Sequence, residues 1–335
     1  MSLGKDMKNK LMRAVAVLSL AVGMSLSVAE KGPGELPQSP AGYKNRVLVL
    51  AAIATGILPL VNADVPLPDG VLLEKDIEYG NVEGRSLKLD LYRPRKIAKP
   101  VPALLFIHGG AWKGGKRQDY HFYTKAFAKK GYMVATVSYR LSGEAPFPAA
   151  VQDCKCAVRW LRANAKKYRI DPNQIAVVGG SAGGHLAMML GYADEPALEG
   201  KGGHAGVSSR VSAVVNLYGV YDMTTEFAQA ASAVKNFLAG KTFAEAPELY
   251  RQSSPRFHLD KNDPPTLILH GTIDEVVPIA QSDALAAHLK RLKIPHEYGR
   301  LTGWPHTMDL AKPVNDYCQA MMDRFFARHL PLPKQ

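Results

Sequence analysis

The feature that most constrains this chain is a serine between glycines, at the junction of a strand-like and a helix-like segment. Residues 175–178 form a short run of apolar side chains, and Gly179-Gly180-Ser181-Ala182-Gly183 follows directly. A Gly-x-Ser-x-Gly spacing in strand–turn–helix context is typical of the sharp turn called a nucleophile elbow. The turn is crowded, so glycines two residues away on either side avoid a collision of side chains. Ser181 is therefore a candidate nucleophile, and a helix-capping serine is the alternative interpretation.

Apolar runs and helical patterns alternate along the rest of the chain. Strands are expected at 103–107, 133–137, 175–178, 211–217, 266–269 and 297–301, and helices at 120–130, 149–168, 182–190, 280–292 and 314–329. Residues 76–93 alternate with period two and predict an antiparallel pair. The alternation predicts an α/β fold, with a mostly parallel, doubly wound sheet and flanking helices. The interval 219–264 is expected to be a small cap region over the carboxyl edge of the sheet, and an ordinary helical layer is the alternative.

A serine hydroxyl needs a histidine base and a carboxylate that orients the imidazole. In a fold of this kind both follow the serine along the chain, on loops after strands. Asp274 stands just past the strand expected at 266–269, with Glu275 as the rival acid. His306 is the histidine of the glycine-, tryptophan- and proline-containing loop before the last helix. His185 follows the elbow by one helical turn and is expected to pack rather than to act as the base.

The reaction of a serine nucleophile also needs hydrogen-bond donors for an oxyanion. The stretch His108-Gly109-Gly110-Ala111-Trp112 follows the first buried strand, and its glycines allow a close approach of the backbone. The predicted donors are the backbone N–H groups of Gly110, Ala111 and Ala182. The aromatic side chains expected to shape a substrate pocket are Trp112, Tyr221 and Trp304. His108 is expected to be structural.

Two apolar runs precede the body of the chain. Leu11 to Val28 follows several basic residues, Val47 to Val61 follows Lys44 and Arg46, and each run ends in small residues. Each therefore has the parts of a secretory signal, and neither comfortably reaches the ~20 apolar residues of a spanning helix. We expect residues 1–63 to be a leader, residues 64–335 to be an exported catalytic domain, and no integral membrane domain. A membrane-anchoring helical hairpin is the competing interpretation.

Composition and charge exclude some other classes. The formal charge is +12, but no basic block interleaved with aromatic residues is present, so nucleic-acid binding is disfavoured. The three cysteines are expected to be buried thiols, although a pair that includes Cys318 fits as well. Histidines and cysteines do not cluster with ligand spacing, so we expect no metal and no organic cofactor.

From Asp64 to its end the chain resembles the α/β-hydrolase superfamily. The residues that carry this resemblance are the His-Gly-Gly-Ala-Trp stretch at 108–112, the elbow around Ser181, His-Gly-Thr-Ile-Asp at 270–274, and Pro305-His306. They are similar to those of the bacterial esterase/lipase branch, near acetyl-xylan and feruloyl esterases. Ala111 departs from the His-Gly-Gly-Gly form of hormone-sensitive-lipase-like enzymes, and it matches the His-Gly-Gly-x-Trp form shared with kynurenine formamidases.

The resemblance implies hydrolysis of carboxylic esters through an acyl-enzyme, with Ser181, Asp274 and His306 as the catalytic triad. Export suits short-chain or aromatic acyl esters such as acylated polysaccharide, a substrate class suggested by analogy. An arylformamidase-like C–N hydrolase is the first alternative, and a prolyl-peptidase-like enzyme is a weaker one because no propeller-length segment precedes the catalytic part. A non-catalytic binding protein on a hydrolase scaffold is the alternative of another class.

Overall fold

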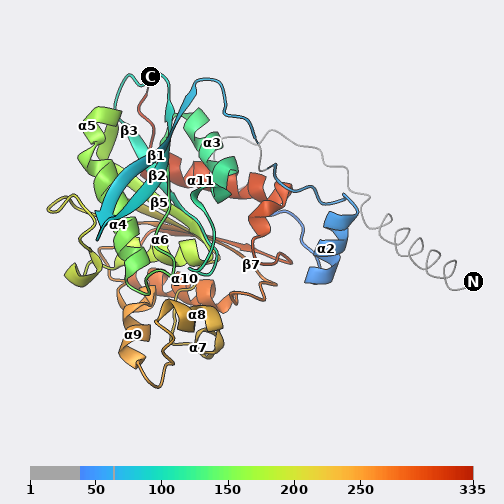
Figure 1. Cartoon of the computed structure of the whole chain (residues 1–335). Helices are drawn as coiled ribbons and strands as arrows, with labels where there is room; N and C mark the ends of the chain where they lie inside the picture. Colours follow the sequence, from blue (N-terminus) through green and yellow to red (C-terminus); the bar gives the residue numbers. More distant parts are fainter. Residues whose placement is uncertain (1–37, 63–64, 335) are drawn as a thin grey trace, which may run out of the picture. The chain divides into compact units, whose positions relative to one another are not determined.

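The computed structural model of this chain describes residues 38–62 and 65–334 (Figure 1). The compact unit that contains them includes residues 38–62, which precede the boundary expected after residue 63. The physical reason is that residues 43–61 are hydrogen bonded to residues 303–312, so the second apolar run belongs to the domain. The first apolar run, Leu11 to Val28, lies outside the described residues. Within the described ranges, every helix is too short or too polar to cross a membrane.

An eight-stranded sheet in the order β1-β2-β4-β3-β5-β6-β7-β8 forms the centre of the fold. Its strands are β1 (Val71–Val82), β2 (Arg85–Pro94), β3 (Val101–Ile107), β4 (Met133–Val137), β5 (Ile170–Gly180), β6 (Ala213–Leu217), β7 (Thr266–Gly271) and β8 (His296–Leu301). The pairs β1/β2 and β2/β4 are antiparallel, and every other neighbouring pair is parallel. The chain leaves β3 for β4 on one side and returns to β5 on the other. Ligands bind at such a reversal, beyond the carboxyl ends of the strands.

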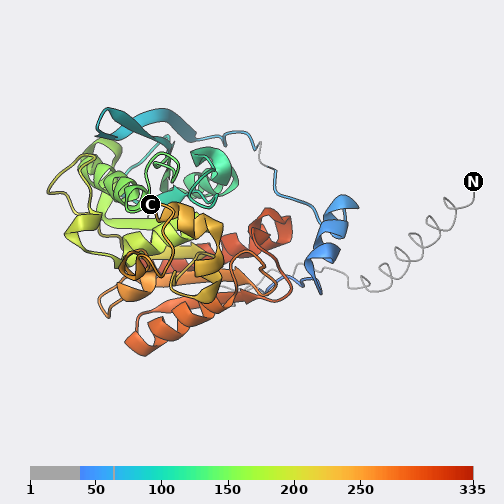
Figure 2. The same ribbon diagram turned by 60° about the horizontal axis from the view of Figure 1, so that its bottom comes forward.

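Helices cover both faces of this sheet (Figures 1 and 2). They are α2 (Arg46–Ala54), α3 (His121–Lys130), α4 (Ala149–Ala163), α5 (Ala165–Tyr168), α6 (Ala182–Tyr192), α7 (Glu226–Ala230), α8 (Ser232–Phe237), α9 (Pro247–Gln252), α10 (Ala280–Leu292) and α11 (Lys312–His329). Helices α4, α6 and α10 share one apolar cluster, whereas α2, α3 and α11 share the other. Strand β3 contributes alternate side chains to both clusters, such as Leu105 to the first and Phe106 to the second. The continuous apolar run at 103–107 is thus a strand buried on both faces.

Two local expectations have a clear outcome in the structure. The single helix expected over 149–168 is divided into α4 and α5 at Asn164. The Asn164 side chain donates to the Trp160 carbonyl at 2.9 Å, which is the kind of local bond that lets asparagine end a helix. All three cysteines are buried free thiols, so the interpretation as small apolar residues is confirmed. The interval expected to form a cap holds the short helices α7, α8 and α9, which group together in Figures 1 and 2.

Candidate active site

Ser181 occupies the turn between β5 and α6, with φ 57° and ψ −124°. Residues other than glycine rarely adopt such a positive φ, so the backbone of this turn is strained. A Cβ on Gly179 would overlap the Gly183 carbonyl oxygen, and a Cβ on Gly183 would overlap the Ile107 carbonyl oxygen. Both positions therefore require glycine. The strained turn presents the Ser181 hydroxyl beyond the carboxyl end of β5.

The structure brings Ser181, His306 and Asp274 into one hydrogen-bonded chain. The Ser181 hydroxyl donates to His306 Nε2 at 2.9 Å, and His306 Nδ1–H donates to Asp274 Oδ2 at 2.6 Å. The three side chains come from loops that follow β5, β7 and β8. The arrangement leaves Nε2 without a proton, so it is able to accept one from the serine. Glu275, the rival acid, is exposed and pairs instead with Arg46.

Asp274 is held as a carboxylate by four donors. Its Oδ1 accepts from the backbone N–H groups of Val276 and Val277, each at 2.8 Å. Its Oδ2 accepts from His306 and also from His270 Nε2 at 3.1 Å. Burial raises the pKa of Asp274, but these hydrogen bonds outweigh burial and lower the pKa to about 2. The carboxylate is therefore ionised wherever a histidine base is neutral.

His270, which opens the His-Gly-Thr-Ile-Asp stretch, also belongs to the site, although no role was predicted for it. Its Nδ1 contacts the Ser282 hydroxyl at 2.7 Å, and its Nε2 also faces the Val277 carbonyl at 2.9 Å. Since both partners of Nε2 are acceptors, Nε2 carries the proton and the hydroxyl donates to Nδ1. His270 thus donates to the same Asp274 oxygen as His306. The signal in the sequence was its spacing of four residues from the acid.

The loop after β3 lies against the elbow. A Cβ on Gly109 would be 2.8 Å from the Gly180 carbonyl oxygen, so only glycine permits this approach. Gly110 and Ala111 have φ values of 104° and 54°, which turn the loop sharply. Among the described residues, the N–H groups of Gly110, Ala111 and Ala182 donate to no other group. Free N–H groups beside a serine are the donors that an oxyanion requires.

His185 links the elbow helix to two other segments. Trp112 Nε1–H donates to His185 Nδ1 at 3.2 Å, and His185 Nε2–H donates to the Ser253 carbonyl at 2.7 Å. Burial lowers the pKa of His185 to about 4, so the ring is neutral. Trp112 also stacks on Phe237, with ring centroids 4.6 Å apart. The expectation that His185 packs is confirmed, and the link to the region of α8 and α9 had no signal in the sequence.

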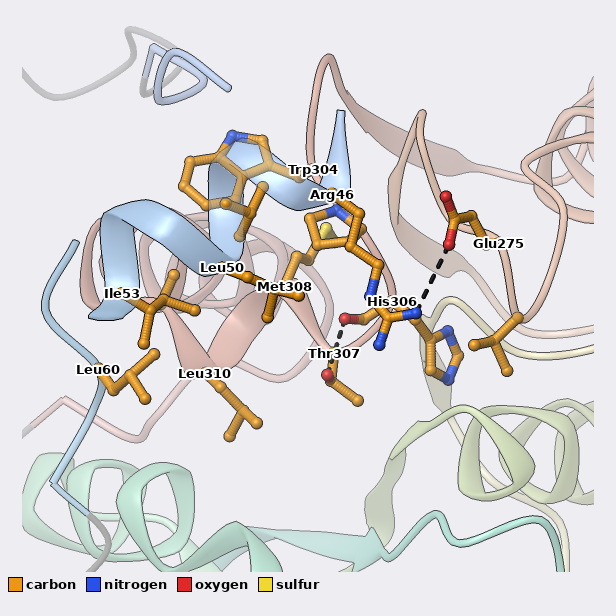
Figure 3. A pocket seen from close by; sticks show the side chains of 14 residues that line it. Arg46, Leu50, Ile53, Leu60, Glu275, Trp304, His306, Thr307, Met308 and Leu310 are labelled. Atoms are coloured by element: carbon orange, nitrogen blue, oxygen red, sulfur yellow. Dashed lines mark hydrogen bonds and ion pairs between the residues drawn. The ribbon is translucent and has the colours of Figure 1, made fainter. Parts of the chain in front are cut away.

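An open cavity of about 270 Å³ lies beside His306 (Figure 3). Its lining residues are Arg46, Val49, Leu50, Ile53, Leu60, Glu275, Val276, Trp304, Pro305, His306, Thr307, Met308, Leu310 and Ala311. Figure 3 shows the apolar side chains of α2 and of the 308–310 turn at one end and His306 at the other. Of the three aromatic residues expected to shape a pocket, the structure brings only Trp304 to this cavity. Trp112 and Tyr221 are buried elsewhere, and the Tyr221 hydroxyl is hydrogen bonded to His288.

A second carboxylate, that of Asp309, is linked to His306 through Tyr218. The Tyr218 ring makes an edge contact with His306, with ring centroids 4.8 Å apart, and the Tyr218 hydroxyl donates to Asp309 Oδ1 at 2.5 Å. Burial raises the pKa of Asp309. This pair was not expected from the sequence, because nothing in the loop distinguishes Asp309 from a surface residue.

In the described part of the chain, no three His, Cys, Asp or Glu side chains are placed to hold a metal ion.

Comparison with known proteins finds one family model and a large group of similar chains. The model described as BD-FAE matches residues 89–289. Esterase LipC of Mycobacterium tuberculosis is 34% identical over 66% of this chain and 57% of its own length. Esterase LipQ of the same organism is 32% identical over 79% of this chain and 64% of its own length. The chain therefore spans less than two thirds of each of these relatives.

This chain is also similar to a solved structure along most of its length. A truncated carbohydrate esterase from gut microbiota superposes with a TM-score of 0.64 at 26% identity. The match covers 77% of this chain and 99% of that one. The strands and helices of this chain thus have the arrangement found in that esterase.

Proposed function

Because the chain belongs to the BD-FAE family of α/β hydrolases, we propose that it is a serine carboxylic-ester hydrolase with Ser181, His306 and Asp274 as its triad. The observation that carries this proposal is the continuous hydrogen-bonded chain from the serine hydroxyl to a carboxylate with a pKa of about 2. A second chain reaches the same carboxylate from Ser282 through His270, but Ser282 is buried, whereas Ser181 lies at a strained strand-to-helix turn of the kind that presents a nucleophile. The relatives whose names describe esterases support the same class of reaction.

The reaction then runs in two halves. Ser181 Oγ attacks the ester carbonyl carbon while His306 Nε2 takes the hydroxyl proton, and Asp274 stabilises the imidazolium that forms. The carbonyl oxygen becomes an oxyanion that accepts from the N–H groups of Gly110, Ala111 and Ala182. Collapse of this intermediate breaks the bond to the alcohol, which leaves with the proton from His306. A water molecule repeats the sequence on the acyl-enzyme and releases the acid.

For the acyl half of the substrate we propose a short-chain or aromatic group. We propose acylated polysaccharide as the natural source of such esters. The name of the carbohydrate esterase among the similar structures supports this choice. We also propose export, which the basic and apolar run at residues 5–28 supports. Amino-terminal sequencing of the protein from the culture medium or periplasm tests export, and recovery of the full-length chain from the cytoplasm alone would contradict it.

The decisive experiment joins labelling with a substrate panel. A small fluorophosphonate should label the wild-type protein on Ser181 and should not label Ser181→Ala. The labelled enzyme should lose its hydrolysis of acetyl, butyryl, feruloyl and long-chain esters in proportion to the label. Turnover of N-formylkynurenine with little ester hydrolysis would favour the formamidase alternative. Absence of both labelling and turnover would favour a binding protein on this scaffold.

A further inference from the structure

Residues 40–61 form a wall of the domain next to the loop that carries His306. Val49 and Ala52 of α2 are buried in the same apolar cluster as α11. Four hydrogen bonds join the segment to the loop: Trp304 Nε1–H to the Pro40 carbonyl, Tyr43 N–H to Gly303, Val61 N–H to Leu310, and Lys312 N–H to Pro59, at 2.8–3.0 Å. Three of these bonds are between backbone groups, so the attachment does not depend on mobile side chains. The segment therefore shapes the space next to the imidazole.

The cavity between this wall and the loop is apolar and open. Of the nine large apolar side chains exposed in the described part of the chain, four line it: Leu50, Leu60, Val276 and Leu310. Leu50 is 53% exposed and Leu60 is 49% exposed, although buried side chains of α2 lie beside them. Apolar side chains gathered around one hollow mark a site where an apolar group is removed from water. The volume of about 270 Å³ is at the lower end of the range for small-molecule sites.

The chemistry of the triad decides which half of an ester can occupy the cavity. In the acylation step the leaving alcohol receives its proton from His306 Nε2, so the alcohol must lie on the side of the imidazole. The carbonyl oxygen points instead to the N–H groups of Gly110 and Ala111, which do not line the cavity. His306 is the residue that the cavity and the triad share. A group that extends from the leaving oxygen past His306 would reach this cavity.

We propose that this cavity binds the alcohol part of the substrate, and that this alcohol carries an aliphatic or arylalkyl body. The proposal rests on the proposed ester hydrolysis but departs from acylated polysaccharide as the source, because it ranks esters of apolar alcohols above esters of sugars. A sugar ring would lose water around its hydroxyls there, because the lining offers few polar partners. The Arg46–Glu275 pair, at 3.5 Å between Nη1 and Oε2, also lines the cavity, but both side chains are exposed and the pair contributes little stability.

The test varies the alcohol while the acyl group stays constant. Methyl, butyl, hexyl and octyl acetates form the same acetyl-enzyme, so their differences in kcat/KM report the acylation step alone. We expect each added methylene to raise kcat/KM by roughly 2- to 4-fold until the cavity is filled. Leu50→Ala should lower kcat/KM for hexyl acetate by roughly 5-fold or more and for methyl acetate by less than about 2-fold. Leu48→Ala is the matched control, since Leu48 lies on the same helix, is exposed and does not line the cavity.

A parallel series of methyl esters with longer acyl groups separates the two halves of the substrate. If Leu50→Ala lowers kcat/KM along the acyl series and not along the alcohol series, the cavity binds the acyl group and the proposal is overturned. No effect on either series would also overturn it, because the cavity would then bind neither half of the ester. A wild-type protein that labels on Ser181 but hydrolyses no ester would instead refute the proposed function.

The same proposal requires that the wall stays on the mature protein. Intact mass and amino-terminal sequence of the exported enzyme should show a first residue before Pro40. An active enzyme that begins near Asp64, with the alcohol dependence unchanged, would show that the wall is dispensable and would overturn the inference.

Discussion

The substitution Asp274→Asn tests the triad more sharply than removal of the serine does, because it changes one atom and keeps the shape of the side chain. The backbone N–H groups of Val276 and Val277 both donate to Oδ1, so the amide oxygen must take that position. The amide nitrogen then takes the place of Oδ2, 2.6 Å from His306 Nδ1. Since this nitrogen only donates, His306 Nδ1 must accept. The proton moves to Nε2, where it blocks transfer from Ser181.

The expected loss follows from this change of tautomer. In another serine hydrolase the equivalent change lowers turnover by about 10⁴-fold with the geometry intact. A factor of that size corresponds to about 5 kcal/mol of lost transition-state stabilisation. We expect a similar loss in kcat, with a KM that changes by less than about threefold, because Asp274 does not touch the substrate.

The substitution also affects the stability of the fold, and the assay must allow for that. The pKa of Asp274 is lowered from an ordinary 3.8 to about 2, so the ionised form stabilises the fold by about 2 kcal/mol above pH 4. That contribution is lost as the pH falls from about 4 to about 2. The variant should therefore melt at a lower temperature at pH 7, and its rates should be measured well below its own Tm.

The assay is the initial rate of hydrolysis of 4-nitrophenyl acetate, together with titration of active serines by a phosphonate. Asp316→Asn is the matched control, since Asp316 is an exposed aspartate in an ion pair with Lys312 and should retain full activity. A folded Asp274→Asn enzyme with more than about a tenth of the wild-type kcat would refute the role assigned to this carboxylate. In that case Glu275, the rival acid, would be tested next.

Three further substitutions test other parts of the structure. Gly183→Ala should destabilise the protein by at least about 3 kcal/mol in urea denaturation, because a Cβ there overlaps the Ile107 carbonyl in the middle of the sheet; a native-like midpoint would contradict the strained elbow. Burial raises the pKa of Asp263 to about 7, so its ionised form destabilises the fold increasingly from pH 4 to pH 7. Asp263→Asn should raise stability at pH 8 by about 1–2 kcal/mol once solvent screening is allowed for, and it should have little effect at pH 4. An equal effect at both pH values would refute the raised pKa of Asp263. Tyr218→Phe removes the donor to the buried Asp309 and should cost about 1–3 kcal/mol of stability by thermal melting, while a change in kcat above about tenfold would show that the pair acts on His306 directly.

Much of this fold was predictable because its signals are local. Strand β3 is an uninterrupted apolar run, and the buried sheet accounts for it on both faces. The elbow could be located because the crowding around Ser181 admits only glycine at two positions. The chain order of the acid and the base then directed attention to Asp274 and His306, which the structure brings to the serine.

The parts that escaped prediction depend on contacts between distant segments. A surface helix such as α2, with basic residues before an apolar run, has the same composition as a secretory signal, and only its partners distinguish the two. The partners of His185 are Trp112 and Ser253, and neither is near it in the chain. No periodicity reports such contacts, because they arise when separate elements pack together.

The attachment of residues 40–61 to the His306 loop has a consequence for the order in which the chain folds. Pro40 and Trp304 are 264 residues apart, and the backbone partners of the segment lie between 303 and 312. The segment is therefore synthesised well before these partners. Until then its apolar side chains are accessible to chaperones. The segment can dock only after the loop with the general base has been synthesised, so we expect the cavity to be completed no earlier than that loop.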